Sequence, residues 1–444
     1  MSRRLLLFFF TLTIPFALGP PEASGQSDRA RGGESRTDML REARVARADS
    51  VRPPQRSTLH RVLLATENRT LLQRIPSLSI YGFRPGFGGI QGGAGTTAGA
   101  VYDPAYVPQG WNLLVDGLAS TKRYWQARLL LGYDAGRTVF YGFARYRHLP
   151  EEGFWGVGPT TSLDNESDYR LDDALVGGLL GYQLSDRANI GVQVGYRNNW
   201  PGPGRDPEHP NVDDRYQAGE LPGLSSTIRH LVLGGFAEWD GRNPSRPFGS
   251  GRRYALVDTR LDGLSFDAKH GFYALAEVSH QIHIDAEDRA DEHFSYVLGR
   301  VVLQEYAAFR RGMQRIAFQQ VAAYSKVTND RFGAVPFYDL PSLGGSNSLR
   351  GFDNLRFRDR GSMMINAEYR WQIWHFTDLV AFVDAGQVFR DVRDIDLDDT
   401  AVSYGGGIRF KLGTLHQGHQ SFARLEAATG KDGARIIFKY GSFF

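Results

Sequence analysis

The sequence predicts an all-β protein, a sixteen-stranded antiparallel transmembrane β-barrel that follows a short N-terminal arm. Three observations support this prediction. The chain begins with an export signal and contains no cysteine. It has 52 glycines, and aromatic residues make up 12% of it. From residue 77 to residue 444, apolar and polar residues alternate along segments of about ten residues, the length of a membrane-crossing strand.

Residues 1–25 have the features of a signal peptide. Arg3 and Arg4 precede an apolar run from Leu5 to Leu18, and Ala23-Ser24-Gly25 supplies small residues for cleavage. The apolar run is shorter than the ~20 residues that a membrane-spanning helix needs, which disfavours a retained anchor. We therefore expect export through the inner membrane with removal of this segment.

Residues 26–76 are predicted to form a periplasmic arm. Residues 26–57 are charged and poor in large apolar groups, as is typical of flexible segments. Thr58–Ile75 has apolar residues at helical spacing, and Pro76 would end a helix there. One short amphipathic helix and an ordered linker are both compatible with this stretch.

Composition excludes several classes of protein. After the signal, no stretch approaches 18 consecutive apolar residues, so the chain is not a helical membrane protein. The net charge is +3, with nearly equal numbers of acidic and basic residues, and so does not indicate a nucleic-acid-binding protein. Without cysteine there is no lipoprotein acylation site, disulfide framework or thiolate metal site. A secreted β-sandwich or propeller and a membrane barrel remain.

The alternation of residues decides between these two classes, and it is clearest from Ser362 to Trp374. One face of this segment is apolar: Met363, Ile365, Ala367, Tyr369, Trp371 and Ile373. The other face carries Met364, Asn366, Glu368, Arg370 and Gln372. Segments 189–197 and 404–411 repeat the pattern. Strands of ~10 residues with one apolar and one polar face favour a lipid-facing wall around a wet lumen, because sandwich strands are shorter, ~5–6 residues.

Sixteen segments of this kind are predicted, an even number as in bacterial single-chain barrels. They start near Ser77, Gly93, Trp111, Arg123, Thr138, Asp168, Arg187, Ile228, Gly271, Phe294, Met313, Ser362, Leu379, Ser403, Phe422 and Ala434. Short turns would be periplasmic, and the long connections 150–167, 198–227, 329–361 and 390–400 extracellular. The exception is 243–269, which is long on the short-turn side and includes a further candidate strand, Tyr254–Leu264.

The connection before the twelfth segment carries the motif Leu349-Arg350-Gly351-Phe352, preceded by Gly344 and Gly345. It resembles the sixth extracellular loop of the BamA/TamA/FhaC superfamily, also called bacterial surface antigen barrels. In that family a V/I/L-R-G-F/Y element folds back into the barrel lumen. The two earlier glycines would allow tight bends. An arginine can enter a lumen only if carboxylates receive its charge, since it does not deprotonate.

The next two segments supply such carboxylates. Glu368 lies in NAEYRW and Asp384 in AFVDAGQVF, and alternation turns both toward the lumen. The family pattern has an acid at each of these positions, and Phe382 and Gly386 fit its F-x-D-x-G strand. The resemblance therefore implies that Arg350 pairs with Glu368, Asp384 or both.

Further matches extend the resemblance over residues 77–444. Asp240-Gly241-Arg242-Asn243-Pro244 resembles the family's D-x-R-D-N-P turn without its middle Asp, and Phe154-Trp155-Gly156-Val157-Gly158 resembles an F-Y-G-x-G loop. The chain ends on Phe444, and Ile436, Phe438 and Tyr440 stand at every second position before it in the last segment. An aromatic-terminated strand of this kind marks a client for outer-membrane insertion.

The resemblance implies an outer-membrane protein that assembles or inserts other outer-membrane proteins, or translocates protein, through a seam between its first and last strands. A passive or gated pore, or a surface protein without insertase activity, is the alternative. The expected partners are membrane lipid and lipopolysaccharide, the barrel assembly machinery as its own insertion factor, and client proteins or a separate periplasmic partner. Large members carry POTRA domains, for which the fifty residues from Gln26 to Ile75 leave no room.

No catalytic, metal or cofactor site is predicted. The sequence has no G-x-S-x-G elbow and no H-x-x-x-H pair on a predicted helix. One loop gathers five aspartates, but without the glycine or the spacing of an EF-hand: Asp391, Asp394, Asp396, Asp398 and Asp399. A solvated acidic loop is the better interpretation of this cluster.

Overall fold

The structure is a computed structural model that describes residues 80–87, 90–104, 107–217, 220–224, 226–243, 268–284, 293–328, 334–414 and 420–440. The chain divides into two units, 1–70 and 71–444, and all described residues belong to the second. Four sequence predictions lie outside the described residues. They are the signal peptide 1–25, the arm 26–76 with its helix, the candidate strand Tyr254–Leu264 and the terminal Phe444.

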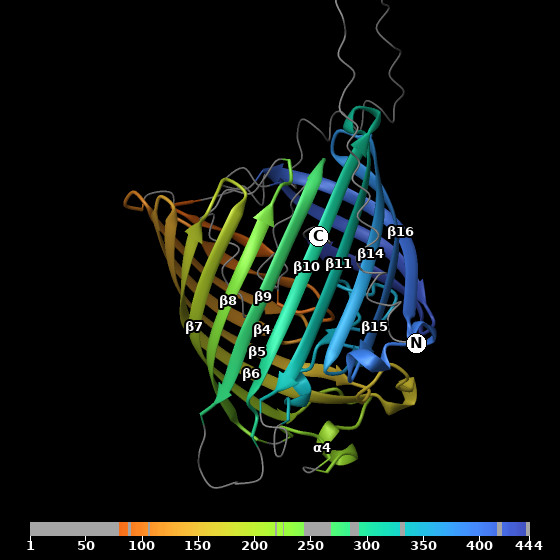
Figure 1. Ribbon diagram of the computed structural model, residues 1–444. Coiled ribbons are helices and arrows are strands. Elements are labelled where there is room, and N and C mark those ends of the chain that lie inside the picture. The colour runs from red at the N-terminus through yellow and green to blue at the C-terminus, as the bar shows by residue number, and fades with distance from the viewer. Residues whose placement is uncertain are drawn as a thin grey trace, which may run out of the picture. The chain divides into compact units, whose positions relative to one another are not determined.

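The described residues form one sheet of sixteen strands, each hydrogen-bonded to its neighbours in the chain (Figure 1). Every pairing is antiparallel, which confirms the predicted fold class. The strands are β1 Phe83–Phe87, β2 Thr97–Tyr102, β3 Trp111–Ser120, β4 Trp125–Ala135, β5 Thr138–Phe154, β6 Ser167–Gln183, β7 Ala188–Pro203, β8 Ile228–Asp240, β9 Gly271–His283, β10 Tyr296–Phe309, β11 Gln314–Val327, β14 Gly361–Trp374, β15 Thr377–Phe389, β16 Ala401–Thr414, β17 Gln420–Gly430 and β18 Gly433–Tyr440.

From β3 onward, each strand begins within two residues of its predicted start. β1 and β2 differ, since they begin at Phe83 and Thr97 instead of near Ser77 and Gly93. The stretch 82–99 contains eight glycines, and glycine weakens strands because it has no side chain to pack. The first hairpin of the barrel is therefore short.

Alternation along β14 follows the predicted register. Tyr369 and Trp371 are exposed on the outer face, whereas Asn366, Glu368 and Arg370 are buried on the inner one. A slip of one residue would have exchanged the two sets. The outer face is apolar and the inner face polar, as a lipid-facing wall requires.

Aromatic residues mark both borders of the apolar band. On β4, Trp125 stacks on Tyr146 with ring centroids 4.9 Å apart, and eight residues later Tyr133 packs against Trp111 at 5.2 Å. Eight residues of antiparallel strand span about 27 Å. Tilted by ~40°, they cover roughly 20 Å of membrane, close to the ~25 Å apolar band of outer-membrane barrels. None of the helices among the described residues is long and apolar enough to cross a membrane.

The two ends of the barrel differ in their connections. Short turns such as 136–137 and 375–376 join strands at one end, which we call the turn end. Long connections join them at the other, the loop end, and one of these carries the single helical turn α4, Val212–Arg215 (Figure 1). The longest connection, 328–360, contains a second small sheet made of β12 Ser342–Leu343 and β13 Phe357–Arg358.

The described part of this connection, 334–360, folds inward and contacts both sides of the lumen. Arg358 donates hydrogen bonds to Gly153 and Tyr169 on β5 and β6, while Arg356 pairs with Asp432 beside β17 and β18. Strands from early and late in the sheet thus meet the same loop. The sheet curves around this loop, which fills the lumen at the loop end.

Candidate functional site

The candidate site is centred on Arg350, whose side chain has no exposed surface. Its Nε and Nη2 donate hydrogen bonds to Asp384 at 2.9 and 2.6 Å, and its Nη1 donates to Glu368 at 2.6 Å. Its backbone N–H also donates to Asp384, at 3.1 Å. The fork of a guanidinium suits this arrangement because it can bind one carboxylate with two nitrogens and a second with the third. We call Arg350, Glu368 and Asp384 the arginine clamp.

The two carboxylates reach Arg350 because of strand register. Asp384 on β15 is opposite Asn366 on β14, and Glu368 follows two residues along the same inner face. Asn366 donates to Asp384 at 3.0 Å and to the Ser348 carbonyl at 2.8 Å. The clamp therefore joins two neighbouring strands to the backbone of the loop.

Further charges surround the clamp. Glu426 on β17 lies 3.7 Å from the Arg350 Nη1, and Arg370 pairs with the second oxygen of Glu368 at 2.7 Å. Each carboxylate in this buried network has more than one partner. Removing a partner would leave a buried charge without compensation, which is strongly destabilising. Although burial acts to lower it, the carboxylates of Glu368 and Asp384 hold the pKa of Arg350 above its ordinary value, so the clamp stays charged.

Phe382 and Gly386 complete the strand motif on β15. The guanidinium of Arg350 lies over the Phe382 ring, 3.4 Å from its centroid, in cation–π geometry. A Cβ on Gly386 would come within 2.9 Å of the Leu343 side chain on β12. Gly386 thus leaves space for the loop to pack against the barrel wall.

Glycines shape the approach of the loop. Gly344 and Gly345 have φ of 118° and 87°, left-handed conformations in which an L side chain would be strained. A Cβ on Gly351 would meet backbone atoms of Thr429 and Gly430 at 2.7 and 2.8 Å. The loop therefore touches β17 so closely that only glycine fits beside Arg350.

Apolar side chains hold the loop on either side of the clamp. Leu349 and Phe352 are almost completely buried in a cluster with residues of the loop and of the inner wall: Leu343, Phe357, Met364, Val388 and Ala401. Phe352 packs edge-on against Phe357 with ring centroids 5.2 Å apart. All four residues of the Leu349–Phe352 motif are thus in contact with the lumen wall or with the rest of the loop.

The second half of the loop contacts the opposite wall, at the Phe154–Gly158 motif. Phe154 is buried, and the guanidinium of Arg358 lies 5.7 Å from its ring centroid. Arg356 lies 5.5 Å from the Trp155 ring and donates to the Thr161 hydroxyl at 2.6 Å. The motif is therefore one of the surfaces that receive the loop.

The other two motifs lie away from the clamp. Arg242 forms a double hydrogen bond with Asp240, at 2.8 and 2.9 Å, and stacks over the Tyr273 ring at the turn end. Phe438 points outward on the last strand, where it is 72% exposed, and Tyr440 ends that strand. Phe444 lies beyond the described residues.

Sequence reasoning missed part of this site. Glu426 faces inward on β17, but that strand is patterned too weakly to be singled out from the sequence. Arg356 and Arg358 stand at alternate positions just after the motif, a repeat that indicates two side chains on one face. Their partners on the opposite wall, Thr161 and Tyr169, are more than 180 residues away, a distance that no local pattern reveals.

The aspartate-rich connection 390–400 has an ordinary structural role. Asp391 and Asp396 cap two short 3₁₀ turns by accepting hydrogen bonds from the backbone N–H groups of Arg393 and Asp398. Within the described ranges, no group of three or more histidine, aspartate or glutamate residues could hold a metal ion. The contacts around Arg350 are ion pairs and side-chain packing, and they attach the loop to the barrel wall.

Comparison with known proteins agrees with this geometry. A family model described as the Omp85 superfamily domain matches residues 117–444. The chain resembles the structure of BamA from Haemophilus ducreyi lacking POTRA domains 1–3, with a TM-score of 0.54 and 15% identity over 82% of this chain and 70% of that chain. It also resembles CdiB from Escherichia coli, with a TM-score of 0.50 and 13% identity over 82% of this chain and 63% of that one. No curated protein matches the sequence.

At these identities the structural likeness shows the fold alone, whereas the family model covers well over half of the chain. The resemblance predicted from the Leu349–Phe352 motif and its two carboxylates is thereby confirmed. This chain belongs to the Omp85 superfamily, whose barrels are proteins of the bacterial outer membrane.

Proposed function

We propose that this barrel inserts or translocates other outer-membrane proteins by opening the seam between β1 and β18. The observation that carries the proposal is that these two edge strands are short and each pairs on one side only among the described strands. In the described part of the sheet, β1 pairs with β2 alone and β18 with β17 alone. They have five and eight residues, whereas the strands of the sixteen-stranded sheet from β3 to β17, which do not include β12 and β13, have ten to seventeen. Short edges make a weak closure.

The outward side chains of β18 are unusually open. Ile436 and Phe438 on β18 are 82% and 72% exposed, well above other outward apolar residues such as Val383 at 49%. A neighbouring strand covers part of each outward side chain, so this exposure fits an edge with little cover. Pro85 in the middle of β1 cannot donate a ladder hydrogen bond, which suits a strand at the edge of a sheet.

Such edges have a direct chemical use. An unpaired strand presents backbone N–H and C=O groups that can pair with an incoming strand, the binding mode called β-augmentation. In lipid each unsatisfied backbone group costs several kcal/mol, so an open edge has a strong tendency to acquire a partner. An unfolded strand of a client barrel offers matching groups of the same kind.

The alternative of a passive pore has less support. The connection 328–360 contacts both walls of the lumen through Arg350, Arg356 and Arg358. A wide permeation path at the loop end would require this loop to leave. Ion conductance through the purified protein with solute selectivity would favour the pore over the seam.

Site-specific photo-crosslinking in living cells tests the proposal. A photoreactive residue replaces Phe438 at the seam or, as the matched control, Ile365, which faces outward on β14, a strand paired on both sides. We expect unfolded outer-membrane barrel proteins to be captured at Phe438 and not at Ile365. Equal capture at both positions, or capture of lipid alone at Phe438, would refute a client-binding seam.

A further inference from the structure

We propose that the edge of β1 that faces the seam is a docking site for the chain's own residues 77–80, which pair with it as a short additional strand. The occupant is the segment that leads into the barrel, and residues 77–79 of it lie outside the described residues. The inference rests on the function proposed above only for its consequence, that a client strand has to displace this segment from the seam.

A tight turn just before β1 sends the chain back along that edge. Ile80 and Phe83 exchange two backbone hydrogen bonds, each 2.9 Å long. Between them, Tyr81 and Gly82 have φ of 50° and 88°, and positive φ at both central residues is typical of the type I′ turn that joins adjacent antiparallel strands. Tyr81 is 94% exposed, so packing of its side chain does not impose this conformation. The chain before Ile80 is therefore directed antiparallel to β1.

The hydrogen bonds of this turn also show which groups of β1 face the seam. In an antiparallel ladder, alternate residues direct their N–H and C=O groups to the same side. The carbonyl of Gly82 accepts from Asp103, next to β2, whereas Phe83 directs both of its groups to Ile80. Pro85 therefore faces the same way as Phe83, away from β2. Because proline has no N–H, the edge presents only a carbonyl at this position.

The sequence of the segment fits this edge. Continuing the register of the Ile80–Phe83 pair places Leu78 opposite Pro85, where the N–H of Leu78 can donate to the Pro85 carbonyl. Unsatisfied backbone groups are costly in lipid, so pairing here is favoured. The predicted start of the first strand, near Ser77, coincides with the beginning of this segment.

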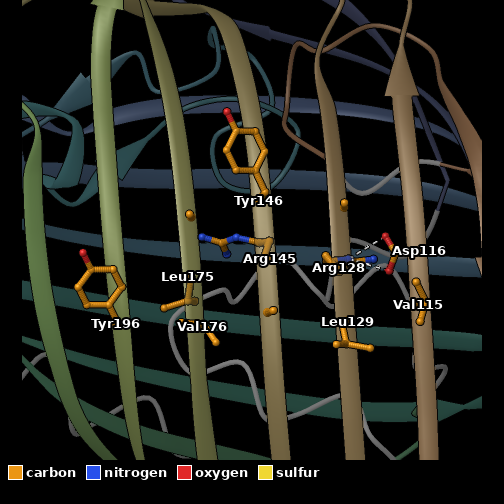
Figure 2. Close-up of a pocket in the computed structure, with 12 residues that line it drawn as sticks. Val115, Asp116, Arg128, Leu129, Arg145, Tyr146, Leu175, Val176 and Tyr196 are labelled. Carbon is orange, nitrogen blue, oxygen red and sulfur yellow. Dashed lines mark hydrogen bonds and ion pairs between the residues drawn. The ribbon is translucent and has the colours of Figure 1, made fainter.

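Side chains of a strand in the barrel wall alternate between lipid and lumen. Figure 2 shows this pattern on β4, where Arg128 donates hydrogen bonds to Asp116 of the neighbouring β3 and Leu129 follows on the same strand. The Asp116 side chain is completely buried, whereas Leu129 is 44% exposed. Any strand added to the edge of β1 has to follow the same alternation.

The segment has this alternation. Ile80 is 65% exposed and Phe83, opposite it, is 57% exposed, so both face outward. With a period of two, Leu78 joins Ile80 on the outer face, while Ser77 and Ser79 face the lumen. An apolar face toward lipid and a hydroxyl face toward the lumen are what a strand at the seam requires.

The docked strand makes few hydrogen bonds. Two join Ile80 to Phe83, and the third joins Leu78 to Pro85. Pro76 is the next residue that would face β1, and it has no N–H to donate, so the pairing ends there. A membrane-crossing strand of a client has ~9–11 residues and can pair along the whole edge. The segment therefore covers the edge in the absence of a client and gives way to a longer strand.

Disulfide trapping in the purified full chain, without a client, tests the docking. In the proposed register the Cα atoms of Leu78 and Pro85 are ~5.5 Å apart, a distance that a disulfide spans. We expect the variant Leu78→Cys, Pro85→Cys to oxidise roughly tenfold faster than the matched control Ser77→Cys, Pro85→Cys, whose side chains face opposite sides. Equal oxidation rates of the two variants would overturn the proposal.

A second pair of variants leaves Pro85 in place, in case its replacement perturbs β1. Ser79→Cys, Arg84→Cys joins two residues that lie opposite each other on the lumen side, and Leu78→Cys, Arg84→Cys is its out-of-phase control. The in-phase variant should again oxidise faster. Oxidation of both variants at one rate would show that the segment does not hold this register.

The consequence for the seam is measured separately, with the photoreactive residue at Phe438 and an unfolded outer-membrane barrel protein as client. Capture by the oxidised Leu78→Cys, Pro85→Cys variant should fall to the level of the Ile365 control, and reduction should restore it. Capture that is the same before and after reduction would overturn the displacement. No capture in either state would count against the proposed function of the seam, whereas the oxidation rates would still decide whether the segment docks.

Discussion

Arg350 shows how one side chain can fix a long loop. Its guanidinium is fully buried and shared between Asp384 and Glu368, and its backbone N–H binds Asp384 as well. This pairing could be predicted from the sequence, because the motif marks the arginine and alternation turns both acids inward. Glu426 could not be predicted in this way, since it belongs to a third strand whose pairing with the loop has no local signal.

Replacing Arg350 with alanine should destabilise the barrel. Removing one partner of a buried ion pair typically costs ~3–5 kcal/mol, because the charges that remain are desolvated without compensation. Asp384→Asn should cost less, since its amide oxygen still accepts one hydrogen bond. The measurement is the free energy of unfolding in urea, together with heat-modifiability on SDS gels. The exposed Arg393→Ala serves as control, with an expected change of ~0–1 kcal/mol. An Arg350→Ala barrel as stable as that control would rule out the clamp.

Gly351 offers a second test at the same scale. A methyl group there would approach the backbone of Thr429 and Gly430 to below 3 Å, and backbone gives way less easily than a side chain. Gly351→Ala should therefore cost ~1–3 kcal/mol, the usual range for overpacking. Gly117→Ala is the matched control, because a Cβ there meets no heavy atom within 4 Å. Equal urea midpoints for the two variants would show that the loop does not press against β17.

Among the elements, the connection 328–360 depends on both walls of the barrel. One half of it is held at β14, β15 and β17, and the other half reaches β5 and β6 through Arg358. The sequence predicted the first attachment and gave no sign of the second. Strand periodicity reports which face a residue occupies, and it carries no information about which distant strand faces it across the lumen.

The second attachment can be tested at Tyr169. Its hydroxyl accepts a hydrogen bond from Arg358 at 2.8 Å, and Tyr169→Phe leaves that guanidinium short of a partner. Hydrogen bonds to charged groups are worth ~1.5–3 kcal/mol, so hydrogen exchange in residues 342–358 should accelerate. Tyr338→Phe is the control, because the Tyr338 hydroxyl has no hydrogen-bond partner within the described residues. Unaltered exchange in the Tyr169 variant would mean that the clamp alone holds the loop.

The connection between β7 and β8 is predicted to respond to pH through His209. Its Nδ1 lies 2.9 Å from Asp206 and its Nε2 3.3 Å from Glu166, and the hydrogen bond with Asp206 raises the pKa of His209. A raised pKa means that protonation stabilises the folded loop. This contribution is complete below the unfolded pKa of ~6.5 and is lost as pH rises through the folded value.

Hydrogen exchange of residues 204–217, corrected for its intrinsic pH dependence, measures this effect. Protection should fall as pH rises from about 5.5 to 8, and His209→Gln should abolish the dependence. The same pH profile in the His209→Gln variant would assign the titration to another group.

At the scale of the whole sheet, every described strand pairs with a neighbour on both sides except β1 and β18. The interior sheet could be predicted because long alternating strands carry a clear period of two, as in β7 and β14. The glycine-rich first hairpin could not be placed accurately, and β1 begins six residues after its predicted start. The alternation of apolar and polar residues is least clear around β1, and β1 is also the shortest strand of the sheet. The weakest part of the sequence pattern therefore coincides with the proposed seam.

Locking that seam is the direct test of the proposed function. The chain has no cysteine, so an introduced pair meets no other thiol within the same molecule. One cysteine replaces Phe83 or Phe87 on β1 and the other replaces Ile436 or Phe438 on β18. The pair that oxidises most completely in the purified barrel is reconstituted into lipid vesicles. The insertion of an unfolded client barrel into these vesicles is then followed.

The control disulfide joins Val301 and Ala322, which are paired between β10 and β11 in the middle of the sheet. We predict that the seam disulfide abolishes client insertion, that reduction restores it, and that the control disulfide leaves it unchanged. Client insertion at the unmodified rate by the oxidised, seam-locked barrel would contradict the account.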